Sequence, residues 1–128
     1  MIHAAIASAI TAAFACGSSG GSTNPTPVGT PGPSGATITI SSAGVVSPSS
    51  VTINNGESVT FVNNDTRAHE MASDPHPAHT DCPPINALGT LQPGQSRLTN
   101  AMTTSRTCGF HDHLNDANAN LRGTIVVR

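Results

Sequence analysis

The residues best suited to chemistry lie in one short segment, residues 106–114 (RTCGFHDHL), which contains Cys108, His111, Asp112 and His113. Thiolate sulfur and imidazole nitrogen are ligands that copper and zinc prefer. Five of the six histidines fall between His69 and His113, so the possible metal ligands are concentrated in one region of the chain. We therefore predict a metal site that brings this segment opposite His69.

A second group of histidines lies in residues 74–81 (DPHPAHTD), where His76 and His79 stand three positions apart between prolines. Such a segment can form a secondary copper or zinc site, or it can be a proline-stiffened loop with solvated histidines. Met71 lies two residues after His69 and would share its face on a strand. It could offer a thioether to Cu(I), although packing in the core is the more common role of methionine.

Short β segments are expected to position these residues. Residues 36–40 alternate polar and apolar side chains and are rich in β-branched types, which is typical of a half-buried strand. Further candidate strands are residues 51–53, 58–62, 95–100, 105–110 and 123–127, with a tight reversal at residues 54–57. Four prolines between residues 75 and 84 exclude a long helix there. The sequence therefore predicts an all-β fold, a small Greek-key β-sandwich of about seven or eight strands.

The composition excludes several classes of function. The 128 residues include five arginines, no lysine and seven acidic residues, for a net charge of −2. This balance provides neither a basic surface for nucleic acid nor an acidic tail. The sequence also lacks the Gly-x-Ser-x-Gly, phosphate-binding glycine and His-Glu-x-x-His motifs. We therefore expect a monomeric protein that is not an enzyme and does not bind nucleic acid.

The N-terminal 35 residues are expected to lie outside the folded domain. Residues 4–15 form a short apolar run of signal-peptide length, and residues 13–17 (AFACG) resemble the lipobox of bacterial lipoproteins. Residues 17–35 are rich in Gly, Ser and Pro, a composition typical of an extended tether. We expect a signal peptide in residues 1–16, a tether in residues 17–35 and a domain in residues 36–128. The protein would be exported to the periplasm or cell envelope and anchored through lipidated Cys16, with an ordinary cleaved signal peptide as the alternative.

The fate of Cys108 decides what kind of metal site is possible. Apart from Cys16, the chain has only Cys82 and Cys108, and an even pair in an exported domain is first interpreted as a disulfide. The spacing Cys108-x-x-His111 favours ligation instead, and both alternatives stay open. With a disulfide, the candidate ligands would be imidazoles alone, those of His69, His111 and His113.

The strand segments and the candidate ligands together resemble a known family. The order of VTFVNN (residues 59–64), His69, Cys108-x-x-His111 and GTIVV (residues 123–127) is similar to that of cupredoxins of the plastocyanin/azurin group. The resemblance covers residues 36–128. It implies a β-sandwich that carries one copper ion at one end, held by a cysteine, two histidines and a weak axial ligand.

This resemblance implies His69 and Cys108 as ligands. The second histidine would be His111 at the plastocyanin-like spacing or His113 at the azurin-like spacing, and the other could also bind or could act through Asp112. The axial position falls on Leu121. Leucine cannot ligate a metal, but some copper proteins of this fold have leucine there.

The resemblance and the residues predict a copper-binding cupredoxin that transfers one electron at a time. A site that suits both Cu(I) and Cu(II) favours this role, and zinc could replace copper. One alternative is a copper capture or delivery protein that binds through histidines while Cys82 and Cys108 form a disulfide. The other is a metal-free structural or interaction module. The sequence does not indicate a redox partner.

Overall fold

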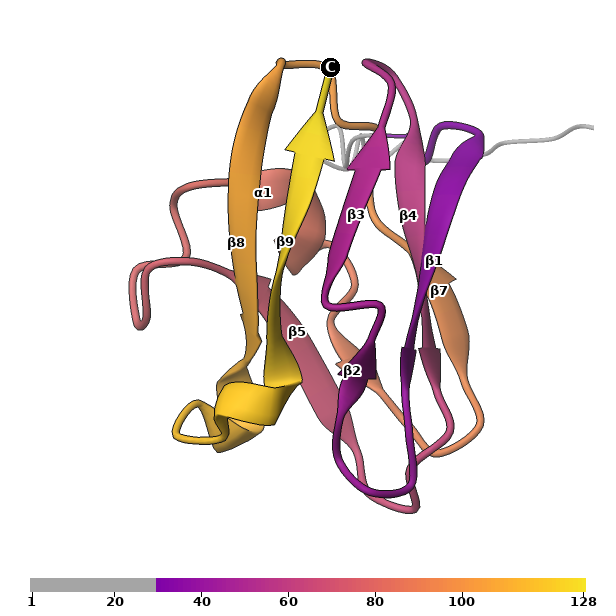
Figure 1. The fold of residues 1–128 in the computed structure, drawn as a ribbon, viewed down its shortest axis with the longest axis vertical. Coiled ribbons are helices and arrows are strands. Elements are labelled where there is room, and N and C mark those ends of the chain that lie inside the picture. The colour runs from indigo at the N-terminus through magenta and orange to yellow at the C-terminus, as the bar shows by residue number, and fades with distance from the viewer. Residues whose placement is uncertain (1–29) are drawn as a thin grey trace, which may run out of the picture.

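The computed structural model describes residues 30–128, which form a β-sandwich of nine strands with one short helix and two 3-10 turns (Figure 1). One sheet has the order β2-β1-β4-β7, with β1 at Ser34–Ile40, β2 at Val46–Ser47, β4 at Ser58–Asn63 and β7 at Ser96–Leu98. The other has the order β3-β9-β8-β5-β6, with β3 at Ser50–Ile53, β5 at His69–Ser73, β6 at Thr90–Leu91, β8 at Arg106–Asp112 and β9 at Arg122–Val127. The expected signal peptide, lipidated Cys16 and most of the tether lie outside the described residues.

The predicted all-β sandwich is confirmed, with small differences at its edges. β1 begins at Ser34, two residues before the expected strand, and the Ala101 amide donates to the Thr30 carbonyl. The middle of the chain contains only one turn of helix, α1 (Pro83–Asn86). Within residues 30–128, no helix is long and apolar enough to cross a membrane.

The turn after β3 forms where the sequence predicts it but connects different partners. Gly56 has a φ of +90°, which glycine adopts without strain, and the Glu57 amide donates to the Asn54 carbonyl over 3.1 Å. β3 belongs to one sheet and β4 to the other. The reversal therefore carries the chain from one layer to the next instead of closing a hairpin.

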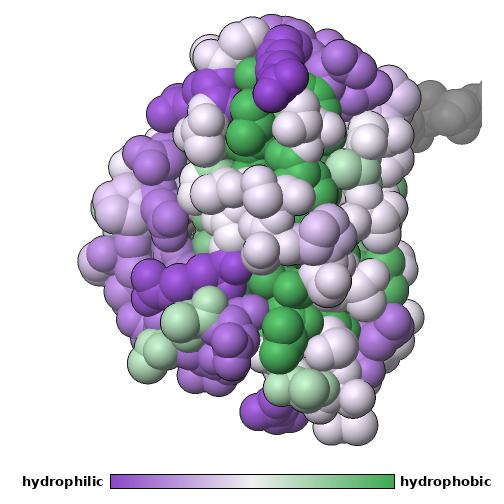
Figure 2. Space-filling model, viewed as in Figure 1, coloured by the Kyte–Doolittle hydropathy of each residue, from purple (hydrophilic) through white to green (hydrophobic). Residues whose placement is uncertain are grey.

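The core between the layers follows from the alternation of side chains along the strands. Ile38 and Ile40 of β1 are fully buried, whereas the threonines beside them are not. Phe61 of β4 and Phe110 of β8 meet edge to face, with ring centroids 5.3 Å apart, and so connect the two sheets. Figure 2 shows hydrophobic side chains in a band between the strands, while the side formed by the loops around β8 is mainly hydrophilic.

The register of β5 against β8 separates the candidate site residues. Met71 lies opposite Asp112, Ala72 opposite His111, and the strands are antiparallel. Residues directly opposite one another share a face of the sheet, and neighbours along a strand alternate between faces. The inner face, which packs on the core, therefore carries His69, Met71, Cys108, Phe110 and Asp112. The outer face carries Glu70, Ala72, Gly109, His111 and His113.

Candidate metal centre

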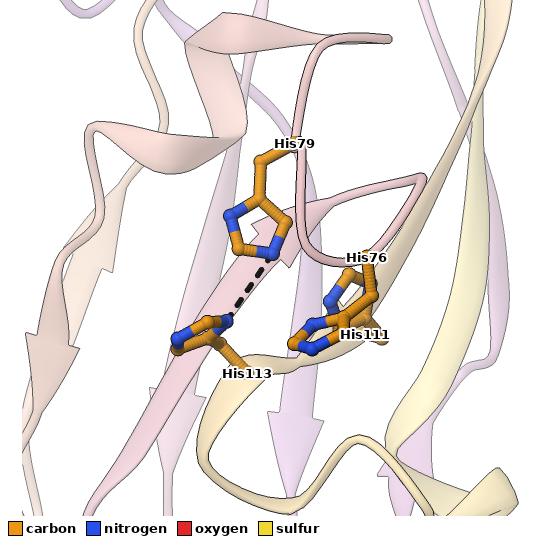
Figure 3. Close-up of side chains that lie close together, drawn as sticks. All are labelled: His76, His79, His111 and His113. Carbon is orange, nitrogen blue, oxygen red and sulfur yellow. Dashed lines mark hydrogen bonds between the residues drawn. The ribbon is translucent and has the colours of Figure 1, made fainter.

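Four histidines come together over the outer face of β8, and we call His76, His79, His111 and His113 the four-histidine cluster. One nitrogen from each ring lies within 4.8 Å of the others. Figure 3 shows two rings reaching from the loop after β5 and two from the end of β8, all turned toward one space. Nδ1 of His113 and Nε2 of His79 are hydrogen-bonded to each other over 3.2 Å. The topology therefore joins two histidine pairs that are more than thirty residues apart in sequence.

The loop that carries His76 and His79 has a fixed shape. The His79 amide donates to the Pro75 carbonyl over 2.7 Å, and the Asp81 amide donates to the Asp74 carbonyl over 2.9 Å. His79 has a φ of +51°, a left-handed conformation that is uncommon for residues other than glycine. Such backbone positions persist where the surrounding structure holds them, often at ligand sites. Here the Asn86 side-chain amide binds the His79 carbonyl over 2.8 Å and provides part of that support.

His111 contains the most informative atom of the cluster. Its side chain is 1% exposed, and its Nδ1 lies 2.7 Å from Oδ1 of Asp74. A carboxylate only accepts hydrogen bonds, so Nδ1 must carry the proton and Nε2 must present its lone pair. Among the described residues, His111 Nε2 is buried and has no hydrogen-bond partner. A buried acceptor without a partner costs free energy, so the position needs another explanation, such as a metal ligand.

The electrostatics of the cluster favour the neutral form of His79. Burial, and then the positive charge of its histidine neighbours in the cluster, lowers the pKa of His79 below the usual 6.5, although Glu70 on the same face opposes the shift. Metals bind the neutral form of imidazole. The lowered pKa of His79 therefore favours the form of this ring that a metal can bind.

The donor set fits a borderline metal ion. Imidazole nitrogens bind zinc at about 2.0–2.1 Å, which places four tetrahedral ligand atoms about 3.3 Å from one another. The spread of the cluster is close enough that small side-chain rotations would let all four contact one ion. His76 is the most exposed ligand, with 36% of its side chain accessible, so the cluster opens to solvent on that side.

His69 lies apart from this cluster, contrary to the predicted ligand set. Its Nδ1 is 2.9 Å from Asp112 Oδ2 and its Nε2 is 3.1 Å from Asp65 Oδ2, so both ring nitrogens are engaged by carboxylates. We call Asp65, His69 and Asp112 the His69 group; all three are buried. The sequence interpretation placed His69 with His111, but the register puts them on opposite faces of the sheet. His69 therefore has no free nitrogen for a metal.

The side chain of Asp112 does not support a metal ligand either. It accepts the Glu70 amide over 2.9 Å and the Leu114 amide over 3.2 Å, in addition to His69. These bonds fix the end of β8 to β5, and so set the backbone on which His111 and His113 stand.

Cys108 forms a disulfide with Cys82, with Cα atoms 5.8 Å apart. The predicted ligation by Cys108 is therefore corrected in favour of the alternative, because a sulfur bonded to sulfur offers no thiolate. Cys108 points to the inner face and is 1% exposed, so its side chain and the four-histidine cluster lie on opposite faces of β8. The disulfide ties the end of the histidine loop to the strand that carries His111.

The remaining candidates are part of the core. Leu121, at the expected axial position, and Met71, a suggested secondary ligand, are both fully buried in the hydrophobic cluster. His76 and His79, which the sequence suggested only for a secondary site, instead meet His111 and His113. The signal for this was the pair of short histidine spacings, His76-x-x-His79 and His111-x-His113, on segments that the cupredoxin order makes neighbours.

Comparisons with known proteins agree with this architecture. No protein-family model matches the sequence, and no curated protein matches it. The structure is similar to a purple cupredoxin from Nitrosopumilus maritimus, with a TM-score of 0.54 and 18% identity over 73% of this chain and 99% of that one. It is similar to oxidised plastocyanin from Dryopteris crassirhizoma, with a TM-score of 0.56 and 23% identity over 72% and 99% of the two chains.

A third similar structure is amicyanin from Paracoccus versutus, with a TM-score of 0.56 and 16% identity over 73% of this chain and 81% of that one. At these identities the likeness concerns the fold. A sandwich of two mixed sheets is present, together with four histidines spaced closely enough to hold a metal ion. The resemblance seen in the sequence is thus confirmed at the level of architecture: residues 30–128 have the cupredoxin fold.

Proposed function

We propose that this protein binds one copper ion through His76, His79, His111 and His113 and serves to capture or deliver it. The observation that carries the proposal is Nε2 of His111, which is buried and has no hydrogen-bond partner among residues 30–128, in a ring that is grouped with three other imidazoles. An apolar or hydrogen-bonded side chain would cost less at that position if the cluster had only a structural role.

The donor set supports capture or delivery over electron transfer. A site that cycles between Cu(I) and Cu(II) in this fold class combines two imidazoles with a soft thiolate. With Cys108 in a disulfide, imidazoles remain, and these suit Cu(II) and zinc. A structure of amicyanin, which shares this fold, is recorded with Cu(I), which favours copper over zinc as the metal. When bound, copper would act as a Lewis acid that accepts the lone pairs of the imidazoles.

The disulfide also supports the expected export of the protein. Disulfides form and persist in oxidising compartments and are rare where thiols are kept reduced. Periplasmic or envelope location, with a lipid anchor at Cys16, therefore remains our proposal for where the copper is bound. A protein tethered there would meet copper before it enters the cell.

The test is a titration of the purified, metal-free chain with Cu(II). Calorimetry measures the affinity and the number of bound ions, and electron paramagnetic resonance identifies the ligand atoms. We expect one equivalent to bind, with hyperfine structure from several nitrogen nuclei and without the intense visible band of a copper–thiolate bond. Binding with an intense blue or purple colour would contradict the proposed ligand set. Failure of the folded chain to bind Cu(II) would contradict the proposed function itself.

The matched control is the double variant His76→Ala/His79→Ala, which removes both loop ligands and leaves β8 intact. We expect it to remain folded, because both side chains belong to a surface loop, and to lose tight copper binding. Parallel titration with zinc measures the preference between the two metals. A double variant that binds copper as tightly as the original chain would exclude the loop from the site.

A further inference from the structure

Asp74 occupies a special position between the two halves of the four-histidine cluster. It is the first residue after β5, and its amide donates to the Gly109 carbonyl of β8 over 3.0 Å. Its carbonyl accepts the Asp81 amide, which closes the histidine loop. Its side chain lies 2.7 Å from Nδ1 of His111. One residue therefore links the loop that carries His76 and His79 to the strand that carries His111.

The carboxylate is placed there by the absence of a side chain at Gly109. A Cβ built on Gly109 would overlap Asp74 Oδ2 and come within 3.0 Å of Asp74 Cγ. Gly109 and Asp74 face each other across the β5–β8 pair on the outer face, where His111 also projects. Gly109 has an ordinary backbone conformation, so space and not a positive φ explains why glycine stands here.

We propose that Asp74 is a positioning residue that fixes the tautomer of His111, and that Gly109 provides the space for its carboxylate. The inference rests on the proposed copper site and adds the residue that prepares one of its ligands. With a carboxylate at Nδ1, the proton is held on that nitrogen, and the lone pair of Nε2 is presented to the metal. A carboxylate behind the imidazole also raises its basicity as a ligand.

Two properties separate this role from general support of the fold. Within residues 30–128, the side chain of Asp74 forms a hydrogen bond only with the His111 ring, and 41% of this side chain is exposed, so it contributes little to the core. His111, by contrast, is buried and has one ring nitrogen without a partner among residues 30–128. If Asp74 were lost, the proton could move to Nε2, and the ligand lone pair would then point away from the cluster.

The first measurement needs no variant: two-bond proton–nitrogen correlation spectra of the metal-free full chain distinguish the two tautomers of each histidine. We expect His111 to carry its proton on Nδ1. A folded chain in which His111 carries its proton on Nε2 would overturn the inference, whether or not the chain binds copper.

The second measurement compares Asp74→Ala with Asp81→Ala. The latter removes the same charge from the same loop, but the Asp81 side chain forms no hydrogen bond or ion pair with a histidine within residues 30–128. We expect Asp74→Ala to shift His111 toward the Nε2-protonated tautomer and to weaken Cu(II) binding about 10- to 100-fold. Asp81→Ala should change neither quantity. Equal losses of affinity in the two variants would mean that Asp74 acts only through its negative charge, and this result would overturn the inference.

A third variant, Gly109→Ala, tests the role of space while Asp74 remains in place. The added methyl group displaces the carboxylate, so in Gly109→Ala we expect the same change of tautomer and a weaker Cu(II) affinity. A separate variant, Asp74→Glu, should recover part of the affinity that is lost in Asp74→Ala. A Gly109→Ala chain with unchanged tautomer and affinity would separate Gly109 from the mechanism. If the original chain binds no copper at all, the proposed function fails, whereas the tautomer of His111 still decides the inference about Asp74.

Discussion

The His69 group and the four-histidine cluster lie back to back on the β5–β8 pair, and they differ in one respect that defines their roles. On the inner face, both nitrogens of His69 are bound by carboxylates, those of Asp65 and Asp112. On the outer face, His111 has one nitrogen bound by Asp74 and the other without a partner among the described residues. Burial alone does not distinguish a ligand from a structural histidine, because both rings are buried.

The comparison teaches that the hydrogen bonds of its ring nitrogens indicate whether a histidine can be a metal ligand. They are a better guide than the place of that histidine in the order of ligands along a cupredoxin chain. In the sequence, His69 occupies the place of the first copper ligand of cupredoxins. In the structure, its surroundings are those of a structural residue that joins the loop before β5 to the end of β8. The four-histidine cluster has the opposite character: its rings lie close together, and Nε2 of His111 has no hydrogen-bond partner among residues 30–128. The predictions below separate stability, which should depend on the His69 group, from copper binding, which should depend on the cluster.

The largest expected effect is on stability, from His69→Ala. The substitution leaves two buried carboxylates without the ring that lies between them, and removing one partner of a buried charged pair costs about 3–5 kcal/mol. Urea unfolding should therefore show a much lower midpoint for the metal-free variant. Under conditions where the variant is folded, its Cu(II) affinity should equal that of the original chain.

The control is the same pair of measurements on His69→Gln, whose amide restores one donor. We expect an intermediate stability and again an unchanged affinity. If either variant loses copper binding while folded, the metal site includes His69, and the separation of the two groups is wrong.

The next effect is that of the disulfide. Replacing Cys82 and Cys108 together by alanine should lower the free energy of unfolding by about 2–4 kcal/mol, since the cross-link restricts the unfolded chain. Copper affinity should fall less than it does on loss of a ligand, because the histidine loop keeps its own hydrogen bonds. Thiol titration of the unreduced chain should find Cys82 and Cys108 unreactive. Two reactive thiols at these positions, with a strong visible band on adding Cu(II), would restore Cys108 as a ligand.

His79→Ala should change the free energy of Cu(II) binding and not the free energy of unfolding, and this change is expected to be smaller than those above. The loss of one of four ligands should weaken Cu(II) binding at least tenfold, or about 1.4 kcal/mol, as measured by competition with a chelator. Stability of the metal-free chain should change little, because the loop is held by backbone hydrogen bonds and by the Asn86 amide on the His79 carbonyl, none of which involves the His79 ring. A variant that is destabilised as much as His69→Ala would make the cluster structural.

Much of the fold could be predicted from local patterns. The alternation in residues 36–40 and the β-branched run at residues 123–127 correspond to β1 and β9, since period-2 burial is a property that each strand shows by itself. The short strands β2 and β6 were missed, because two residues carry too little periodicity to be recognised. The turn at Gly56 was predicted, but its role between two sheets depends on pairings with distant strands.

The site was predicted only in part, for a reason that lies in the register. The sequence indicates that His69 and His111 are near one another in space, and they do lie on adjacent strands. Whether they share a face depends on how those strands pair, because a shift of one residue turns every side chain to the other face of the sheet. The order of ligands along the chain contains no information about that pairing. The same uncertainty applies to Cys108, whose inward direction brings it to Cys82 and away from the histidines.

The role of His76 and His79 could not be assigned for a different reason. They stand in a loop whose path over the outer face is set by backbone bonds from Asp74 and by the left-handed turn at His79. Proline content predicts that such a loop is stiff but not where it points. The sequence contains two short histidine spacings, His76-x-x-His79 and His111-x-His113. They indicate a shared metal site only when the two segments are known to be neighbours in space.

The smallest expected effect concerns acid stability and the outer edge of the His69 group. A hydrogen bond from the Arg67 side chain, together with bonds from His69 and the Thr66 amide, lowers the pKa of Asp65 from 3.8 to about 2, although burial opposes this. Because the folded chain holds this carboxyl more strongly ionised than the unfolded chain does, Asp65 stabilises the fold above about pH 4, and this contribution disappears as the pH falls toward 2. In Arg67→Ala we expect the pKa of Asp65 to rise toward 3.8 and the acid transition to move to higher pH.

Carbon chemical shifts of the Asp65 carboxyl against pH measure the first effect, and unfolding followed against pH measures the second. Arg106→Ala removes an exposed arginine that makes no side-chain hydrogen bond within residues 30–128, and serves as the control for charge alone. The change at neutral pH should be slight, since 60% of the Arg67 side chain is exposed and water and salt screen the pair. An unchanged titration in Arg67→Ala would mean that His69 and the Thr66 amide suffice to hold Asp65 ionised. The buried residues of the His69 group would then hold Asp65 ionised without the exposed arginine. The group would differ even more from the four-histidine cluster on the other face, which is open to solvent.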